Sequence, residues 1–231
     1  MENFIVYGPG RTGTTTLVHL IDIHPESGVI ECELWSDRTK SNFKEFKKEF
    51  ASACEQFDGH KILVGQLNEQ MREYALSSEC KVILTSRRNV LKAAVSRMIA
   101  RQTGRWTIQQ KSVEPEVYEP LVLTEVAKYM NIQKRVVWAR EVLMRAHKTP
   151  FEVVYEDFYL AVLELKIETL KRMFVFLGLS PTVTKEMVGV LERGPIINQR
   201  HYLKIPNIYE IEKGLGSDEK GWLFDGYGGL V

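Results

Sequence analysis

Short runs of consecutive apolar residues alternate along the chain with longer segments in which apolar residues recur every three or four positions. The short runs predict strands buried on both faces, at residues 4–7, 29–35, 62–65, 82–84 and 151–155. The longer segments predict amphipathic helices, at residues 17–21, 42–57, 69–76, 90–100, 124–147 and 160–177. Strands that alternate with helices are typical of a parallel sheet covered on both faces, so we expect an α/β fold.

The chain has 231 residues, which suits one α/β domain over residues 1–231. Residues 101–123 have no clear period and predict an excursion from the core, or a lid. Glycine is frequent in residues 195–231, which predict a loop-rich tail. Ser180 and Pro181 predict the start of a further helix that ends at Gly194, because serine is a good N-cap and proline fits the first turn.

Charge and cysteine content narrow the class of protein. The net charge of +1 gives no indication of general binding to nucleic acid or to an anionic membrane. Cys32, Cys54 and Cys80 are an odd number without a C-x-x-C pair, which predicts reduced thiols rather than a disulfide framework or a zinc site. No apolar run approaches the ~20 residues of a membrane span, and no signal peptide precedes the first strand. We expect a soluble cytoplasmic protein.

A glycine-rich loop, residues 8–15, joins the first strand to the first helix. Its backbone N–H groups and the positive end of the helix dipole suit an anion, as do the Arg11 charge and the hydroxyls of Thr12, Thr14 and Thr15. A plain turn would explain the glycines but not this arginine and these threonines. The spacing nearly fits the P-loop, G-x-x-x-x-G-K-[ST], but Thr14 occupies the lysine position. The loop predicts a phosphate site unlike that of an ordinary ATPase or GTPase.

A second basic segment follows the fourth strand. The strand runs into Thr85, Ser86, Arg87 and Arg88, and Ser96 lies on the next helix. The carboxyl ends of parallel strands meet at one edge of a sheet, which is where ligands bind in open α/β folds. Arg88 and Ser96 therefore predict a second phosphate site next to the first.

These motifs resemble those of sulfotransferases. Residues 10–15 resemble the family's 5′-phosphosulfate loop, and Arg88 with Ser96 resembles its 3′-phosphate motif, although Asn89 and Val90 stand where many members have Asp-Pro. Residues 155–158, Tyr-Glu-Asp-Phe, are similar to the family's Tyr-Glu-Asp-Leu segment. Further similar segments are the helix end at residues 176–179 and the stretch 94–106, which looks most like bacterial carbohydrate sulfotransferases. The resemblance spans roughly residues 3–180.

The resemblance implies a donor, 3′-phosphoadenosine 5′-phosphosulfate (PAPS), whose sulfuryl group passes to an alcohol or amine and leaves 3′-phosphoadenosine 5′-phosphate (PAP). The acceptor would be a small molecule or a glycan, and no metal is needed. Arg11 would stabilise the leaving oxygen as a catalytic residue. The residues implied to bind the nucleotide are Arg11, Thr12, Gly13, Thr14, Thr15, Arg88 and Ser96.

The expected general base is a glutamate. Cytosolic members of the family use a histidine in the region that residues 63–68 match, and this segment has none. Several carbohydrate-type members use a glutamate after the second strand, where Glu31 and Glu33 lie. Glu33, which is followed by Leu34 and Trp35, is the expected base. Glu31 is the alternative, and Trp35 and Trp106 are candidates for stacking on an acceptor sugar.

Two other functions stay open at this point. One is a nucleotide kinase or NTPase with a degenerate P-loop, which would need a lysine in the loop or an acidic partner for Mg²⁺. The other is a non-catalytic nucleotide-binding protein that keeps the loop without turnover.

Overall fold

The computed structural model describes residues 2–32, 42–106, 115–193 and 199–224. It confirms the α/β fold: five parallel strands form one sheet in the order β2-β3-β1-β4-β5. The strands are β1 (Phe4–Gly8), β2 (Ile30–Cys32), β3 (Gly59–Leu63), β4 (Lys81–Ser86) and β5 (Phe151–Val154). Each predicted strand is present, although β3 begins three residues before the expected start.

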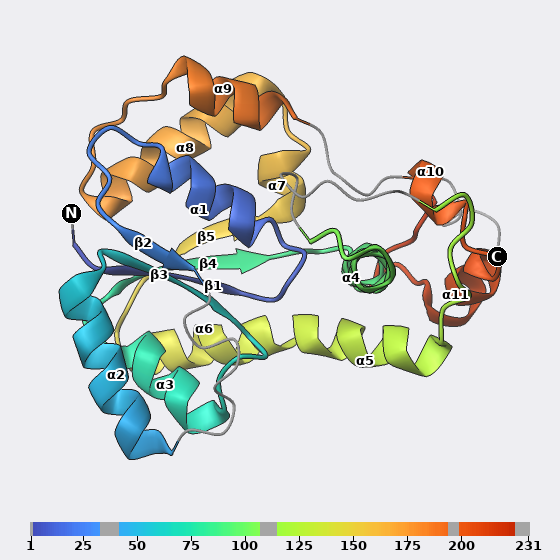
Figure 1. The fold of residues 1–231 in the computed structure, drawn as a ribbon, viewed down its shortest axis with the longest axis horizontal. Helices are drawn as coiled ribbons and strands as arrows, with labels where there is room; N and C mark the ends of the chain where they lie inside the picture. The colour runs from blue at the N-terminus through green and yellow to red at the C-terminus, as the bar shows by residue number, and fades with distance from the viewer. Residues whose placement is uncertain (1, 33–41, 107–114, 194–198, 225–231) are drawn as a thin grey trace. The chain divides into compact units, whose positions relative to one another are not determined.

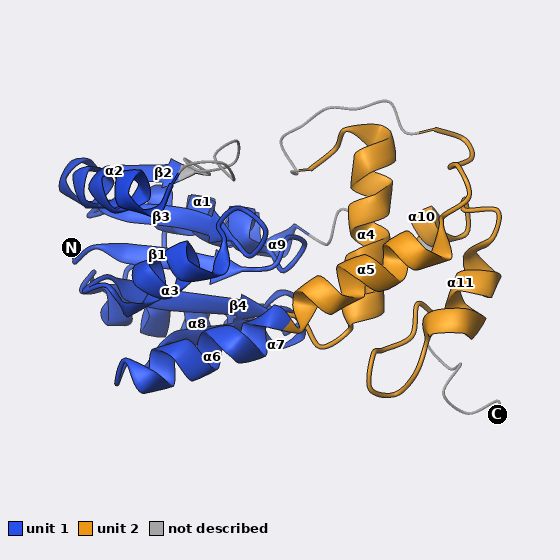
Figure 2. Cartoon of the chain, turned by 90° about the horizontal axis from the view of Figure 1, so that it is seen from below, with its two compact units in different colours: residues 1–86, 135–193 blue, residues 87–134, 194–231 orange. Residues whose placement is uncertain are grey.

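The contacts divide the chain into two compact units, coloured separately in Figure 2. Unit 1 comprises residues 1–86 and 135–193 and holds the whole sheet, whereas unit 2 comprises residues 87–134 and 194–231. Both units combine segments from two parts of the chain. The single domain expected over residues 1–231 stays a prediction.

Helices cover both faces of the sheet in unit 1. Figure 1 shows α1, α8 and α9 on one face and α2, α3 and α6 on the other. The helices of this unit are α1 (Thr14–Asp22), α2 (Phe43–Gln56), α3 (Glu69–Ser77), α6 (Arg135–Arg145), α7 (Tyr155–Tyr159), α8 (Leu163–Leu177) and α9 (Lys185–Glu192). This layering buries both faces, which explains why the strands read as continuous apolar runs.

Side chains on neighbouring strands alternate between the two layers. Phe4 and Val6 of β1 pack with Ile83 of β4 and Val153 of β5 in the core beneath α1, α8 and α9. The intervening residue Ile5 alternates to the other face and is also buried. In the parallel register Val6 lies opposite both Ile83 and Lys61 of β3, so these three side chains share one face.

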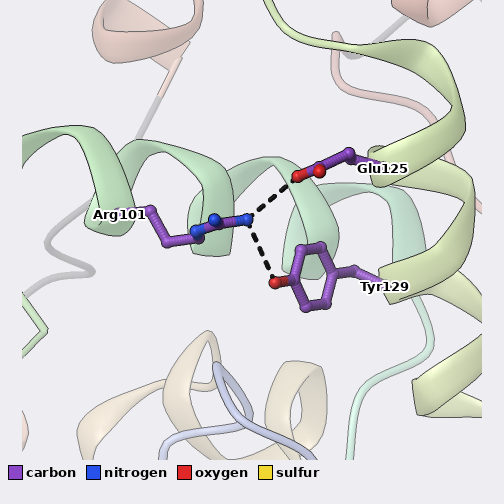
Figure 3. A network of polar contacts seen from close by, with 3 residues as sticks. All are labelled: Arg101, Glu125 and Tyr129. Carbon is purple, nitrogen blue, oxygen red and sulfur yellow. Dashed lines mark hydrogen bonds and ion pairs between the residues drawn. The ribbon is translucent and has the colours of Figure 1, made fainter.

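Unit 2 is helical in its described part. Its helices are α4 (Val90–Thr103), α5 (Leu123–Gln133), α10 (Gln199–Tyr202) and α11 (Ile208–Leu215). Apolar residues of α4, α5 and α11, including Val95, Val126 and Ile211, form its core. Figure 3 shows that Arg101 of α4 also donates to Glu125, at 2.9 Å, and to the Tyr129 hydroxyl, at 3.3 Å. These contacts are half-exposed, so core packing is the main stabilising term.

The structure has more helix than expected in two places. The predicted excursion at residues 101–123 is still helical up to Thr103, because α4 continues past residue 100. The predicted loop-rich tail, residues 195–231, contains α10 and α11. The fully buried carboxylate of Glu212 accepts hydrogen bonds from the backbone N–H groups of Leu223 and Phe224, which fixes the segment after α11.

One helix start differs from the prediction. The helix expected to start at Ser180 and Pro181 is α9, and it starts at Lys185 because the Thr184 hydroxyl caps it by accepting from the N–H of Met187. The long helical segment expected over residues 124–147, for which a break was allowed, is divided into α5 and α6. No helix in the described part of the chain is long and apolar enough to cross a membrane.

Candidate functional site

The loop between β1 and α1 has an unusual backbone. Arg11 has a φ of 69° and Gly13, the residue that precedes α1, has a φ of 84°, so both are left-handed. Left-handed residues beside right-handed ones turn successive N–H groups toward one side, which makes a concave site for anions. Glycine adopts this conformation freely, but for Arg11 it costs about 1–2 kcal/mol. Strain of this kind is typical of ligand-binding loops.

Gly8 brings β1 very close to β4. A Cβ atom at this position would lie 2.0 Å from the Thr85 hydroxyl oxygen and 2.7 Å from the Thr85 carbonyl oxygen. On its other side, the Gly8 carbonyl accepts a hydrogen bond of 3.0 Å from the N–H of Val64. Only glycine fits here, and the start of the loop is therefore fixed between two neighbouring strands.

Thr12 holds the loop to the sheet. Its hydroxyl donates to the Pro9 carbonyl at 2.7 Å and lies 2.8 Å from the Thr85 hydroxyl, and its side chain is fully buried. A hydroxyl has one hydrogen, which Thr12 uses on Pro9. The expectation that this hydroxyl donates to a phosphate does not fit the geometry, and only the backbone N–H of Thr12 is left for that role.

Tyr159 fixes the other end of the loop. Its hydroxyl donates to the Gly13 carbonyl at 2.7 Å, and its ring occupies the space that a Cβ on residue 13 would need, 2.1 Å from the nearest ring atom. Burial raises the pKa of Tyr159, so the hydroxyl stays protonated and remains a donor. Tyr159 ends α7, directly after the Tyr-Glu-Asp-Phe segment. The sequence prediction did not include it.

A buried lysine supplies a second cation next to the loop. The ammonium of Lys61 donates to the Thr15 hydroxyl at 3.0 Å, and Lys61 is only 4% exposed. Thr15 lies in the first turn of α1, and the neighbouring Thr14 begins this helix and is buried. Lys61 comes from β3, so the sequence motif of the loop gave no sign of it. The one sequence feature that could have indicated this contact is a lysine next to the apolar run of β3, because a lysine inside a buried strand needs a polar partner.

The candidate bases lie on and after β2. Glu33 and Trp35 lie outside the described residues. Glu31 is half-buried and lies opposite His60 in the register with β3, so the two share the face that α2 covers. Lys61 and Thr15 lie on the opposite face. Glu31 is therefore poorly oriented for chemistry at the loop.

The histidine of β3 is part of the core. His60 is fully buried, with its ring centroid 6.1 Å from those of Phe50 and Phe57. Desolvation lowers the pKa of His60 to about 4, which keeps the ring neutral near pH 7. His60 is not placed to serve as a base for an acceptor.

Arg88 and Ser96 belong to unit 2, and their convergence with the loop stays a prediction. Arg88 is exposed and Ser96 is buried on α4. Between them, Asn89 caps α4 by accepting from the N–H of Lys92 at 2.8 Å, while its amide donates to the Trp222 carbonyl at 2.7 Å. Aspartate, which many sulfotransferases have here, could cap the helix but could not donate to Trp222.

Trp106, a candidate for stacking on an acceptor, is 39% exposed. The Arg97 guanidinium lies over its ring, at 5.8 Å from the centroid, and over the Tyr129 ring at 4.5 Å. The described part of the chain has no group of three or more His, Cys, Asp or Glu that could hold a metal ion. The expectation of a metal-free site stays a prediction.

No protein-family model matches this chain, and a comparison with curated proteins finds no match. The family that the motif resemblance implies therefore stays a prediction.

The close approach of β1 to β4 can be tested by substitution. Gly8→Ala places a Cβ against both the side chain and the backbone of Thr85, so we expect the free energy of unfolding to fall by about 2 kcal/mol or more. The matched control is Gly65→Ala, at an exposed position with nothing within 4 Å of the added Cβ, where we expect a change within about 0.5 kcal/mol. Urea unfolding of both variants measures the difference. Equal losses would contradict the packing at Gly8.

Proposed function

We propose that this protein is a sulfotransferase, which transfers the sulfuryl group of PAPS to a hydroxyl of a small-molecule or glycan acceptor. The observation that carries the proposal is the β1–α1 loop. Three features of this loop suit an anion: the left-handed backbone at Arg11 and Gly13, the N-terminus of α1, and the nearby ammonium of Lys61. The motif resemblance then favours a phosphosulfate as this anion.

Sulfuryl transfer is an in-line displacement at sulfur. The acceptor oxygen forms a bond to sulfur and gives its proton to a base, while the bond from sulfur to the bridging oxygen breaks and the 5′-phosphate of PAP gains the negative charge. Positioned cations stabilise this charge as it develops. Arg11 would act on the leaving oxygen. Lys61 would supply positive charge through Thr15, which would also bind the 5′-phosphate with Thr14 and the N–H groups of the loop.

The Lys61–Thr15 contact favours this proposal over a nucleotide kinase or NTPase. In a P-loop, the Ser or Thr that follows the lysine position binds Mg²⁺ through its hydroxyl. Thr15 occupies that position, but its hydroxyl accepts from an ammonium group 3.0 Å away. A magnesium ion at Thr15 would be repelled by this charge. The site suits an anion that arrives without a metal.

The binding of nucleotides tests the proposal directly. We expect PAP to bind without a metal and at least tenfold more tightly than AMP, because each charge-assisted hydrogen bond to the 3′-phosphate contributes ~1.5–3 kcal/mol. Arg88→Ala should abolish this preference without weakening AMP binding. Isothermal titration calorimetry, with ATP and Mg²⁺ as the competing ligand, measures these affinities. A preference for ATP–Mg²⁺ would instead support the kinase or NTPase alternative.

The role of Lys61 can be separated from that of an ordinary strand lysine. Lys61→Met keeps the alkyl chain but removes the charge near the developing phosphate, so we expect kcat to fall about 10²–10³-fold. Lys81→Met is the matched control, because Lys81 begins β4 and its ammonium pairs with Glu2, at 3.2 Å. Its kcat should stay within a few fold. Steady-state assays with ³⁵S-labelled donor measure both, and a similar loss in the two variants would argue against the role of Lys61.

We propose Glu33 as the base, with Glu31 as the internal control. Glu33→Gln cannot accept the acceptor's proton, so we expect kcat to fall about 10²–10⁴-fold with donor affinity nearly unchanged. Glu31→Gln should keep its turnover within a few fold, because Glu31 lies inside β2, opposite His60, whereas Glu33 follows the strand. The same labelled assay decides between them. An active Glu33→Gln protein with an inactive Glu31→Gln protein would reverse the assignment.

A further inference from the structure

Two cysteines lie together at the amino edge of the sheet in unit 1. Cys54 is in the last turn of α2, and Cys80 directly precedes β4. Their sulfur atoms are 3.7 Å apart, although 26 residues separate them in sequence. Both line a cavity of about 730 Å³, whose other lining residues include Ala51, Tyr74 and Ser77. Cys54 is partly exposed and Cys80 is 4% exposed.

Hydrogen bonds fix both cysteines at the backbone. The Asn3 side chain donates to the Cys54 carbonyl at 2.6 Å, and the Cys80 N–H donates to the Ser78 hydroxyl. The ammonium of Lys148 donates to the carbonyls of Ser78 and Cys80, which brings a positive charge beside the second cysteine. The two sulfur atoms are thus held at close range from two different elements.

We propose that Cys54 and Cys80 form a thiol–disulfide exchange site that reacts with a low-molecular-weight disulfide and closes to an intramolecular disulfide. The cavity admits the small disulfide to the sulfur atoms. Closure needs the two sulfurs to approach from 3.7 Å to the ~2.05 Å of a disulfide bond. This shift is small enough for side-chain rotation together with a slight movement of the end of α2.

The reaction has two steps. The Cys80 thiolate attacks one sulfur of the small disulfide, RSSR, so that a Cys80–S–S–R bond forms and one thiolate, RS⁻, leaves. Cys54 then loses its proton to solvent and attacks the Cys80 sulfur, which forms the Cys54–Cys80 bond and releases the second RS⁻. Both cysteine thiols are oxidised, and RSSR is reduced to two RSH.

The local chemistry supports Cys80 as the attacking thiol. The contact with the Cys54 sulfur and the charge of Lys148 lower the pKa of Cys80, despite its burial. The same contact, together with desolvation, raises the pKa of Cys54. Since the thiolate is the nucleophile, Cys80 attacks first and Cys54 resolves the mixed disulfide.

The test uses oxidised glutathione with the full chain at pH 7. We expect the intact mass of the wild-type protein to fall by two hydrogen atoms with no glutathione retained, and peptide mapping to find Cys54 linked to Cys80. Cys32→Ser is the matched control, and it should give the same link. A link that includes Cys32, a persistent glutathione adduct on the wild-type protein, or no reaction would each overturn the proposal.

Single variants test the order of attack. Cys54→Ser should stop at one glutathione on Cys80, because the resolving thiol is missing. Cys80→Ser should add glutathione to Cys54 more slowly than Cys54→Ser adds it to Cys80, because the Lys148 charge lies beside Cys80 and favours the thiolate there. Equal rates in the two variants would overturn the assignment of Cys80 as the attacking thiol. Mapping of the wild-type protein decides the link itself, even if a variant does not fold.

Discussion

Two hydroxyl groups, those of Thr12 and Thr85, meet at 2.8 Å where the neighbouring strands β1 and β4 end. Thr12 also donates to Pro9, so this single residue ties the loop both to itself and to the next strand. The contact is possible only because Gly8 has no side chain to separate the strands. A loop fixed in this way can hold Arg11 in a left-handed conformation, which a free loop would relax. The geometry of the loop is therefore a property of the sheet.

The source of the positive charge could not be predicted from the loop motif. In a P-loop the lysine belongs to the motif itself, whereas Lys61 comes from β3 and reaches Thr15 from the adjacent strand. The prediction started β3 at residue 62 because His60 and Lys61 are polar. The sheet buries both residues, on opposite faces, and the long alkyl chain of lysine allows its ammonium to reach a polar partner. The register of β1 and β3 decides which partner the ammonium of Lys61 meets. This register cannot be predicted from the residues around Lys61 alone.

Most of the fold could be predicted, because hydrophobic periodicity and the order of strands and helices are local features. The glycine-rich loop was also placed correctly between β1 and α1, although α1 begins at Thr14 rather than at Leu17. Predictions failed where the same residue types are compatible with two different local structures. Ser180 and Pro181 resemble a helix start, but Thr184 is the actual cap. Glycines in the tail indicated loops, although the buried Glu212 and the apolar residues of α11 give this segment a core. Such long-range contacts have no sequence signature.

The two edges of the sheet have opposite electrostatic character, which explains why different chemistry lies at each. At the carboxyl edge, the N-terminus of α1 meets the loop and favours an anion. At the amino edge, α2 and α3 end beside the cysteines, and helix C-termini disfavour negative charge. A thiolate at Cys80 therefore needs a compensating cation. Lys148 meets this need, because its ammonium donates to the carbonyls of Leu76, Ser78 and Cys80 and so neutralises the end of α3. Lys148 therefore both caps the C-terminus of α3 and stabilises a thiolate at Cys80, which the helix C-termini alone would disfavour.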